Sequence, residues 1–377
     1  MLADSPLAVR IRDRLLALDS HNLRRSLRPP AGIDLSSNDY LNLSTDERVT
    51  RAFVEGAECD GVGSTGSRLL RGDRAAFHHV EEQFAAFKGT ERALFFSSGY
   101  LANLAVLTAL TEKGDVLFSD ARNHASLIDG AKLSRAEIVV VPHNDLDALA
   151  DLLRATPCEG VRFVVVESLY SMDGDLARLA EYRDLCRAMH ATLIVDAAHA
   201  VGVCGASGSG AIEDAGIDAN DCLSVNTAGK ALGVSGAFVA GPAWAIEHLV
   251  QRARPFIFST AAPPAVAHAI AASLRIIRAE PQRRERLRAR AAYLRHRLNE
   301  AGIDTPAGLS HIISVVIGDN ERTLTVAARL QSAGFDARAI RPPSVPEGTA
   351  RLRLSVNAGL DEAVLDRFVR ALVRALA

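Results

Sequence analysis

The stretch SVNTAGKALGVSGAFVAG, residues 224–241, decides the fold because it joins two strand-like apolar segments through a turn that holds one lysine, Lys230. Gly229, Ala231 and Gly233 surround the lysine, and the stretch contains no other charged residue. Lysines are mostly exposed, so an exposed turn between two strands is one interpretation. The other is a chemical role for the amine, which the surrounding sequence has to support.

The sequence on both sides of this stretch alternates between strand-like and helix-like segments. Short apolar runs that end in polar residues occupy residues 92–98, 115–120, 137–142, 162–168, 192–199 and 221–227, with helix-like patterns at 79–87, 100–110 and 176–191. This alternation predicts an α/β fold with a mostly parallel sheet flanked by helices. Ligands bind at the carboxyl ends of the strands in such folds, so residues that follow each strand are site candidates.

A chain of 377 residues fits one large and one smaller domain. We predict an N-terminal helical arm over residues 1–45, a large α/β domain over 46–265 and a small C-terminal α+β domain over 266–377. Two helix-like segments, 263–280 and 282–301, open the last of these, and strand-like IISVVIG and RLRLSV and a terminal helix follow. The arginines of 282–301 are typical of a solvated helix face.

The composition excludes several classes of protein. With 48% hydrophobic and 23% charged residues the chain is ordinary for a globular protein, and its net charge of -2 gives no case for nucleic acid or an anionic membrane as partner. No window of about 18 uncharged apolar residues exists, so no membrane span is expected. The five cysteines form no CxxC pair, which argues against a disulfide framework or a zinc site. Reduced thiols and the lack of a signal-peptide pattern favour a cytoplasmic protein without a metal.

One candidate anion site lies in FFSSGYLANLAVL, where Ser97, Ser98 and Gly99 leave a strand and a helix begins near Tyr100. Free backbone N–H groups and the helix dipole make such a turn a phosphate site. Serine is also an ordinary helix cap, and that alternative stays open. The chain lacks GxxxxGK[ST], and GVGSTGSRLLRG follows no clear strand, so nucleotide-binding motifs are disfavoured.

Asp196 ends the apolar run of TLIVDAAHA, with His199 three residues on, and Lys230 follows the next strand. Asp196 could merely cap a helix, but an anion turn, a carboxylate in the crevice and a lysine are together what pyridoxal 5'-phosphate requires. They would supply a phosphate cradle, a partner for the ring nitrogen and an amine for the aldehyde. His124 could lie on the ring face and Thr227 could donate to the phosphate, although a lone histidine is more often structural.

Nine motifs follow one another along nearly the whole chain: SSNDYLNLS, GSTGSRLLRG, FFSSGYLAN, HASLIDGAKLS, SLYSMDGD, DAAH, TAGKALGVSG, RPFIFST and RPPSVPEGTARLRLS. In these motifs the sequence resembles the α-oxoamine synthase family of fold-type I pyridoxal-phosphate enzymes. The resemblance implies a large domain with a mostly parallel sheet and a smaller C-terminal α+β domain. It also implies a homodimer with active sites at the interface, where GSTGSRLLRG reaches the partner's cofactor.

The resemblance implies catalytic roles for four residues. Lys230 would carry the cofactor, Asp196 would hold its ring nitrogen, His199 would bind its phenolic oxygen and His124 would stack on its ring. The other implied cofactor contacts are Ser98, Gly99, Tyr100, Glu167, Ser171 and Thr227.

The resemblance also implies substrate contacts. Asn38 and Arg353 would hold an amino-acid carboxylate, Arg353 through a bidentate pair. Arg24 and Ser344 match positions along the path of an acyl substrate, and His124 would also face the substrate.

Four positions depart from the family pattern. Ala197 occupies a position where the family has an acidic residue. Ser344 replaces a threonine and keeps a hydroxyl there. Ala200 stands for a glycine, and because alanine resists positive φ the turn after His199 would differ unless the glycine was not needed there. Asn42 also replaces a glycine, but asparagine tolerates the left-handed region.

The motifs are most similar to the branch of the family that condenses L-alanine with a pimeloyl thioester, on coenzyme A or a carrier protein, in biotin synthesis. Three alternatives stay open. One is a branch that uses glycine with acetyl or succinyl thioesters, the second is a pyridoxal-phosphate aminotransferase, and the third is a non-catalytic relative suggested by Ala197 and Ala200. Small-molecule substrates are expected in all but the last.

Overall fold

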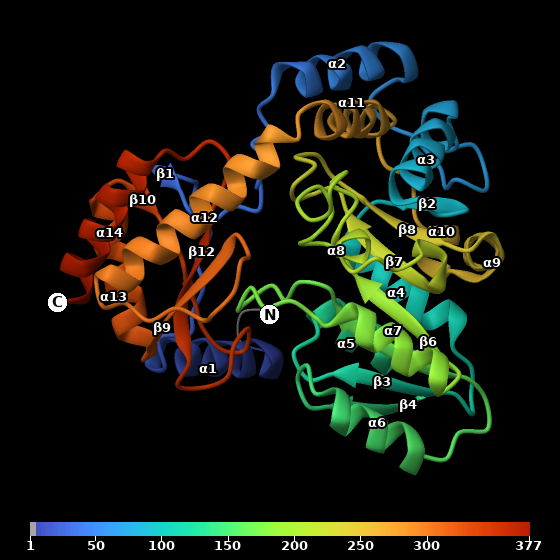
Figure 1. The fold of residues 1–377 in the computed structure, drawn as a ribbon, viewed down its shortest axis with the longest axis horizontal. Coiled ribbons are helices and arrows are strands. Elements are labelled where there is room, and N and C mark those ends of the chain that lie inside the picture. Colours follow the sequence, from blue (N-terminus) through green and yellow to red (C-terminus); the bar gives the residue numbers. More distant parts are fainter. Residues whose placement is uncertain (1–4) are drawn as a thin grey trace. The chain divides into compact units, whose positions relative to one another are not determined.

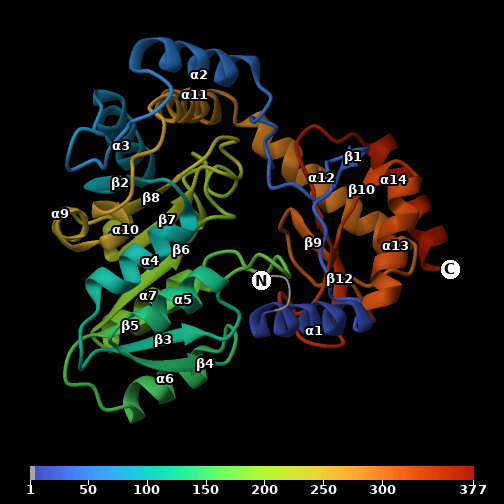
Figure 2. The ribbon, with the colours of Figure 1, turned by 180° about the vertical axis from the view of Figure 1, so that it is seen from behind.

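A computed structural model describes residues 5–377, and the contacts within the chain divide it into two units (Figures 1 and 2). The larger unit contains residues 38–171 and 175–287. The smaller contains the described residues up to Ser37, residues 172–174 and residues 288–377.

A seven-stranded sheet forms the centre of the larger unit. Its strands, in spatial order, are β2 (Arg92–Phe96), β8 (Ala237–Gly241), β7 (Cys222–Thr227), β6 (Ala191–Asp196), β5 (Arg162–Glu167), β3 (Val116–Asp120) and β4 (Glu137–Val141). β8 is antiparallel to both of its neighbours, and the other pairs are parallel. The predicted α/β fold with a mostly parallel sheet is confirmed.

Helices cover both faces of this sheet (Figures 1 and 2). The helices of the larger unit are α2 (Glu47–Asp60), α3 (Ala75–Lys88), α4 (Gly99–Leu110), α5 (Ala125–Leu133), α6 (Leu146–Ala155), α7 (Leu179–Ala188), α8 (Ala211–Asp214), α9 (Ala243–Arg252), α10 (Arg254–Ile257) and α11 (Ala265–Ala279), of which α2 packs on α11. Alternation along each strand separates the two faces. Phe238 stacks on Phe84 of α3 with ring centroids 4.0 Å apart, whereas the adjacent Val239 belongs to the core that α4, α5 and α9 close.

The strand register brings the ends of the parallel strands to one edge of the sheet. Glu167 of β5 pairs with Asp196 of β6, and Thr227 of β7 and Phe96 of β2 both pair with Ala237 of β8. The residues that follow β2, β5, β6 and β7 therefore lie along the same edge, as the sequence predicts for a ligand site.

The smaller unit contains a three-stranded antiparallel sheet in the order β11 (Ala339–Ile340), β12 (Ala350–Ser355), β9 (Ile312–Gly318). β1 (Ile33–Asp34) pairs in parallel with β10 (Phe335–Asp336). Its helices are α1 (Pro6–Ser20), α13 (Asn320–Ser332), α14 (Glu362–Leu376) and the part of α12 (Gln282–Glu300) that follows Leu287.

The two units differ from the predicted domains at two places. Residues 266–287 lie in the larger unit because α11 packs against α2, where Gly56 lies so close to His268 that an added Cβ would be 2.7 Å from its ring. The described residues up to Ser37 group with the C-terminal part because β1 pairs with β10. The division into domains with boundaries at 45/46 and 265/266 stays a prediction.

Two further findings concern the described part of the chain. Within residues 5–377 no helix has the length and apolar character needed to cross a membrane, and no cluster of side chains could hold a metal ion. The five cysteines are free thiols.

The turn after Lys230 depends on Gly233. This residue has φ of +69°, and a Cβ there would lie 2.4 Å from the backbone nitrogen of Ser44. We expect Gly233→Ala to lower the free energy of unfolding by more than the roughly 1–2 kcal/mol of a left-handed alanine alone, because the backbone of residues 43–44 must also move. Gly216→Ala is the matched control, since Gly216 has φ of +63° and no described atom within 4 Å of its Cβ position. Equal losses for the two variants in urea unfolding would contradict the close approach.

Candidate active site

Lys230 is partly buried in the turn that follows β7, and its amine lies 2.7 Å from Nε2 of His199. The amine therefore does not sit in an exposed turn among solvated charges. It faces the residues that follow β6, which supports the chemical role over the exposed-turn interpretation.

His199 is held on its other side by Tyr40. The Tyr40 hydroxyl lies 2.7 Å from Nδ1 of His199 and donates to Oδ1 of Asn38 at 2.9 Å. Because a hydroxyl has one hydrogen, it accepts from Nδ1–H of His199, and Nε2 is then free to accept an N–H from Lys230. Tyr40 and His199 are both buried, and in this tautomer His199 orients the Lys230 amine.

Asp196 ends β6 as a buried carboxylate with two hydrogen-bond donors. The backbone N–H of Ala198 donates to Oδ1 at 2.9 Å, and Nδ2 of Asn103 donates to Oδ2 at 2.7 Å. Donors on both oxygens fix the orientation of this side chain at the end of the strand.

His124 is the N-cap residue of α5. Its Nδ1 accepts from the backbone N–H of Ser126 at 3.2 Å and lies 2.7 Å from the Ser126 hydroxyl. Burial lowers the pKa of His124, and the nearby positive charge of Lys230 adds to this, against the opposing charge of Asp196. Because Nδ1 accepts a hydrogen bond from the Ser126 N–H, it carries no proton in this arrangement and the ring is neutral.

Glu167 is a buried carboxyl at the end of β5 and is 3% exposed. Burial and the charge of Asp196 raise its pKa to about 8, although Lys230 and the backbone N–H groups of His124 and Ser171 favour ionisation. Within residues 5–377 its Oε1 has no hydrogen-bond partner. Glu167 is thus largely protonated at neutral pH and leaves a polar atom available to a bound molecule.

The turn from β2 into α4 has the geometry expected of an anion site. Ser98 is the N-cap of α4, with its hydroxyl accepting from Leu101 N–H at 3.3 Å. A Cβ on Gly99 would lie 3.7 Å from Cβ of Thr227, so glycine keeps this space open. The Thr227 hydroxyl accepts from Gly229 N–H and donates to the Gly236 carbonyl oxygen, each at 3.2 Å. The helix-cap interpretation of Ser98 is confirmed, and the phosphate site at this turn stays a prediction.

Four other predicted contacts are Tyr100, Arg24, Arg353 and Ser344. The Tyr100 hydroxyl donates to Asp129, so only the backbone of Tyr100 is available as predicted. Three predicted substrate residues belong to the smaller unit, where Arg24 forms an ion pair with Asp19 at 2.6 Å and Arg353 donates to the Ser355 hydroxyl at 2.7 Å. Ser344 is exposed on the loop before β12.

Tyr40, Asn103 and Ser126 were not predicted from the sequence as site residues. Tyr40 lies in the quoted motif SSNDYLNLS, and Ser126 follows His124 by two residues. Asn103 carried a usable signal, because it is an amide on the face of an otherwise apolar helix and is 2% exposed. A buried amide on such a helix needs polar partners. In the structure these partners are Asp196 and Ser126.

The departures from the family pattern cause little local change. Ala200 is buried and is not among the residues of 5–377 with positive φ, so the turn after His199 has no need of glycine there. The left-handed residue comes two positions later, at Gly202. Asn42 has φ of +53°, which confirms the left-handed conformation expected for it. Nothing in the structure explains Ala197 beyond its fit in the core.

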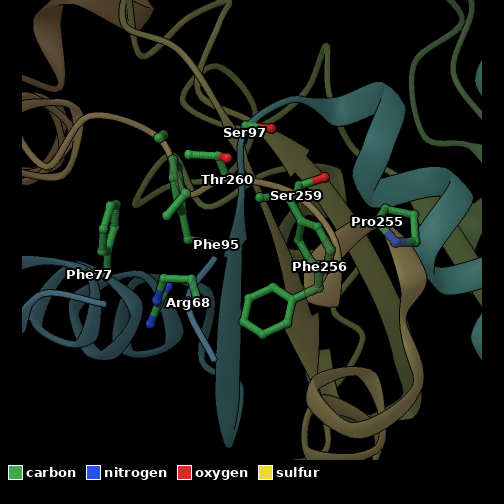
Figure 3. A pocket seen from close by; sticks show the side chains of 11 residues that line it. Arg68, Phe77, Phe95, Ser97, Pro255, Phe256, Ser259 and Thr260 are labelled. Carbon is green, nitrogen blue, oxygen red and sulfur yellow. The ribbon is translucent and has the colours of Figure 1, made fainter. Parts of the chain in front are cut away.

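A pocket beside the end of β2 is lined by residues of GSTGSRLLRG and RPFIFST (Figure 3). Arg68 lies over the Phe77 ring at 4.7 Å from its centroid and forms a two-pronged pair with Glu81 at 2.9 and 3.2 Å. Ser97, from the anion turn, lines the same pocket. Arg68 is thus engaged in holding this loop against the sheet.

The state of Glu167 predicts a pH dependence of stability. Between pH 4.5 and about 8 the folded protein keeps a proton that the unfolded chain has lost, so this group makes stability fall as pH rises through that window. We expect Glu167→Gln to remove this loss, so that the variant gains on the wild type in urea unfolding as pH rises from 5 to 8.5. Exposed Glu58 provides the control variant Glu58→Gln. A constant difference between Glu167→Gln and wild type across this range would contradict the raised pKa.

These residues fit pyridoxal phosphate. The Lys230 amine faces the acceptor Nε2 of His199, and Asp196 at the end of β6 accepts two hydrogen bonds. His124 caps α5, and the N-terminus of α4 begins beside Thr227. Together with the sheet order, they define a fold-type I pyridoxal-phosphate-dependent transferase.

Comparison with known proteins agrees. The model of the aminotransferase class I and II family matches residues 30–372. The 8-amino-7-oxononanoate synthase of Paraburkholderia xenovorans is 48% identical, with 89% of this chain and 86% of the relative covered, and that of Geobacter sulfurreducens is 44% identical with 97% of each covered. The chain belongs to the aminotransferase class I and II family and, within it, to the family of the 8-amino-7-oxononanoate synthases.

Solved structures with the same fold include a serine palmitoyltransferase of Sphingomonas wittichii, with a TM-score of 0.91 and 31% identity over 98% of this chain and 97% of that one. A Francisella tularensis 8-amino-7-oxononanoate synthase has a TM-score of 0.79 and 29% identity, covering 91% and 97%. The expected fold type and the dependence on pyridoxal phosphate are confirmed.

Proposed function

We propose that this chain condenses L-alanine with a pimeloyl thioester to give 8-amino-7-oxononanoate, CO2 and a free thiol. The observation that carries the proposal is the 42–48% identity to synthases of this name over most of the chain. The geometry supports it, because the lysine, histidine and carboxylate meet at the strand ends. The glycine-using and aminotransferase alternatives are less favoured.

When bound, pyridoxal phosphate supplies an aldehyde that joins to an amine and a protonated ring that draws electrons from the substrate Cα. Lys230 holds the cofactor and, as a free amine, takes the proton from Cα. His199, through its Nε2 acceptor, orients that amine. Asp196 would accept a hydrogen bond from the ring nitrogen, and the N-terminus of α4 with Thr227 would hold the phosphate.

The proposed substrate contacts rest on the resemblance. Asn38 and Arg353 bind the carboxylate of alanine, and Arg24 and Ser344 contact the acyl chain. Asn38 already accepts from Tyr40, which ties it to the same hydrogen-bonded set as His199.

The homodimer and the cytoplasmic location are also proposals. Support for a dimer comes from Leu69 and Leu70 of GSTGSRLLRG, which are 48% and 82% exposed in the single chain. Exposed leucines in a motif expected to reach the partner would be covered in a dimer. Light scattering should give twice the chain mass of 40.2 kDa.

The test is an assay of purified protein with L-alanine, glycine or L-serine against pimeloyl, acetyl, succinyl and palmitoyl thioesters of coenzyme A and pimeloyl carrier protein. We expect thiol release and CO2 with alanine and a pimeloyl thioester only. A preference for glycine with a short thioester, or for serine with a long one, would overturn the substrate assignment. Conversion to the pyridoxamine form by an amino acid alone would identify an aminotransferase.

A further inference from the structure

Asn103 of α4 connects two site residues through the two hydrogens of its amide nitrogen. Nδ2 donates to Oδ2 of Asp196 at 2.7 Å and to the Ser126 hydroxyl oxygen at 2.9 Å. A carboxylate only accepts, so the orientation of the amide is fixed. Among the described residues its Oδ1 has no partner, although the side chain is 2% exposed. An unpaired buried acceptor destabilises the folded state, so its presence here is a cost to folding.

The direction of the remaining protons follows. The backbone N–H of Ser126 can only donate, so Nδ1 of His124, 3.2 Å away, is an acceptor. The Ser126 hydroxyl accepts from Asn103, which leaves its own hydrogen to donate to the same Nδ1 at 2.7 Å. With Nδ1 accepting twice, the neutral ring of His124 carries its hydrogen on Nε2.

We infer that Asn103 and Ser126 are positioning residues that act together, holding Asp196 as a hydrogen-bond acceptor and His124 in the Nε2–H tautomer. Its catalytic consequence rests on the proposed function, because His124 and Asp196 are the residues assigned to the ring face and the ring nitrogen. In this tautomer Nε2 donates and cannot accept, so His124 does not act as a base. The proton from Cα then goes to Lys230.

The network is needed because the groups around His124 have opposite effects on whether its ring is protonated. Asp196 on β6 and Asp129 on α5 favour its protonated form, whereas burial and Lys230 after β7 disfavour it. Glu167 on β5 accepts from its backbone N–H. Two donors on Nδ1, together with the N-terminal end of α5, support the neutral ring against both aspartates.

The test uses full-length protein labelled with 15N-histidine, with and without pyridoxal phosphate, and the His124 signals are assigned by their loss in His124→Gln. Nitrogen NMR distinguishes the protonated from the unprotonated ring nitrogen. We expect wild-type His124 to show Nε2–H and no titration between pH 6 and 8. Ser126→Ala, which removes one donor to Nδ1, should bring a titration into this range. Thr108→Val is the matched control on α4, because the Thr108 hydroxyl bonds only the Leu104 carbonyl.

Asn103→Leu keeps the size and removes both donors. We expect its cofactor dissociation constant to rise at least tenfold and the bound cofactor's absorption to change its pH dependence, while Thr108→Val matches wild type in both. An Nδ1–H tautomer in wild type, an unchanged His124 titration in Ser126→Ala, or unchanged cofactor binding in a folded Asn103→Leu would overturn the inference. The NMR result without cofactor does not depend on the reaction, so a negative thioester assay beside the expected NMR spectra would reject the proposed function alone.

Discussion

Lys230→Ala should stop turnover while leaving a folded protein that still binds pyridoxal phosphate. The change removes both the covalent anchor and the amine that takes the proton from Cα. General-base catalysis alone is worth about 10² to 10⁴ in rate, so we expect product formation to fall by more than about 10⁴-fold. Asp196, His124 and the turn at Ser98 remain, so noncovalent binding should persist. The measurements are thiol release in the thioester assay and cofactor binding by absorbance.

The chain contains three other lysines, of which Lys113 is exposed and lies outside the site. Lys113→Ala is therefore the control and should keep wild-type turnover. Product formation by Lys230→Ala within about tenfold of this control would show that another group carries the reaction.

Asp196→Asn should produce the second largest loss. The change replaces a buried carboxylate with a neutral amide that cannot hold a proton on the ring nitrogen, and its NH2 group would also face the Asn103 donor. Removing one partner of a buried, hydrogen-bonded charge pair costs about 2 to 5 kcal/mol, which corresponds to a rate loss of roughly 30-fold to several thousand-fold.

The loss should lie in carbanion formation, so the direct measurement is exchange of the alanine Cα–H with deuterated solvent. Asp151→Asn, on the exposed face of α6, is the control. An unchanged exchange rate in a folded, cofactor-bound Asp196→Asn would remove Asp196 from the assigned role.

Much of the fold could be predicted from the sequence because each sheet strand is a short apolar run with a polar end. The runs at 192–199 and 221–227 became β6 and β7, and 236–241 became β8. The antiparallel direction of β8 was not predicted. The connection between β7 and β8, which carries Lys230 and Gly233, is too short for the crossover that a parallel strand needs. The antiparallel direction therefore follows from a length that is visible in the sequence.

The grouping of residues into these two units could not be predicted from the sequence, because it depends on long-range contacts. The pairing of Ile33 with Phe335 ties the arm to the C-terminal part, and the close approach of Gly56 and His268 ties α11 to α2. Neither contact leaves a local pattern in the sequence. The helix at 47–60 was missed although its sequence carries a helix-like pattern, with Asp46 as N-cap and apolar residues spaced along one face.

The candidate site could be predicted where a residue type alone carries the chemistry. Asp196 ends β6 and Lys230 follows the adjacent β7, and the Lys230 amine lies 2.7 Å from Nε2 of His199, while the cofactor roles of these residues stay predictions. Tyr40 and Asn103 act through these residues, so their roles depend on contacts that cross the sheet. Such contacts appear only once the strand order is known.

The central claim is that the cofactor joins the protein at Lys230. Borohydride reduction of the protein with bound pyridoxal phosphate, followed by peptide mass spectrometry, tests it directly. A phosphopyridoxyl group on the peptide that contains Lys230, and on no other, is the predicted result. An adduct on Lys88, Lys113 or Lys132 instead, or no adduct after incubation with the cofactor, would contradict the account.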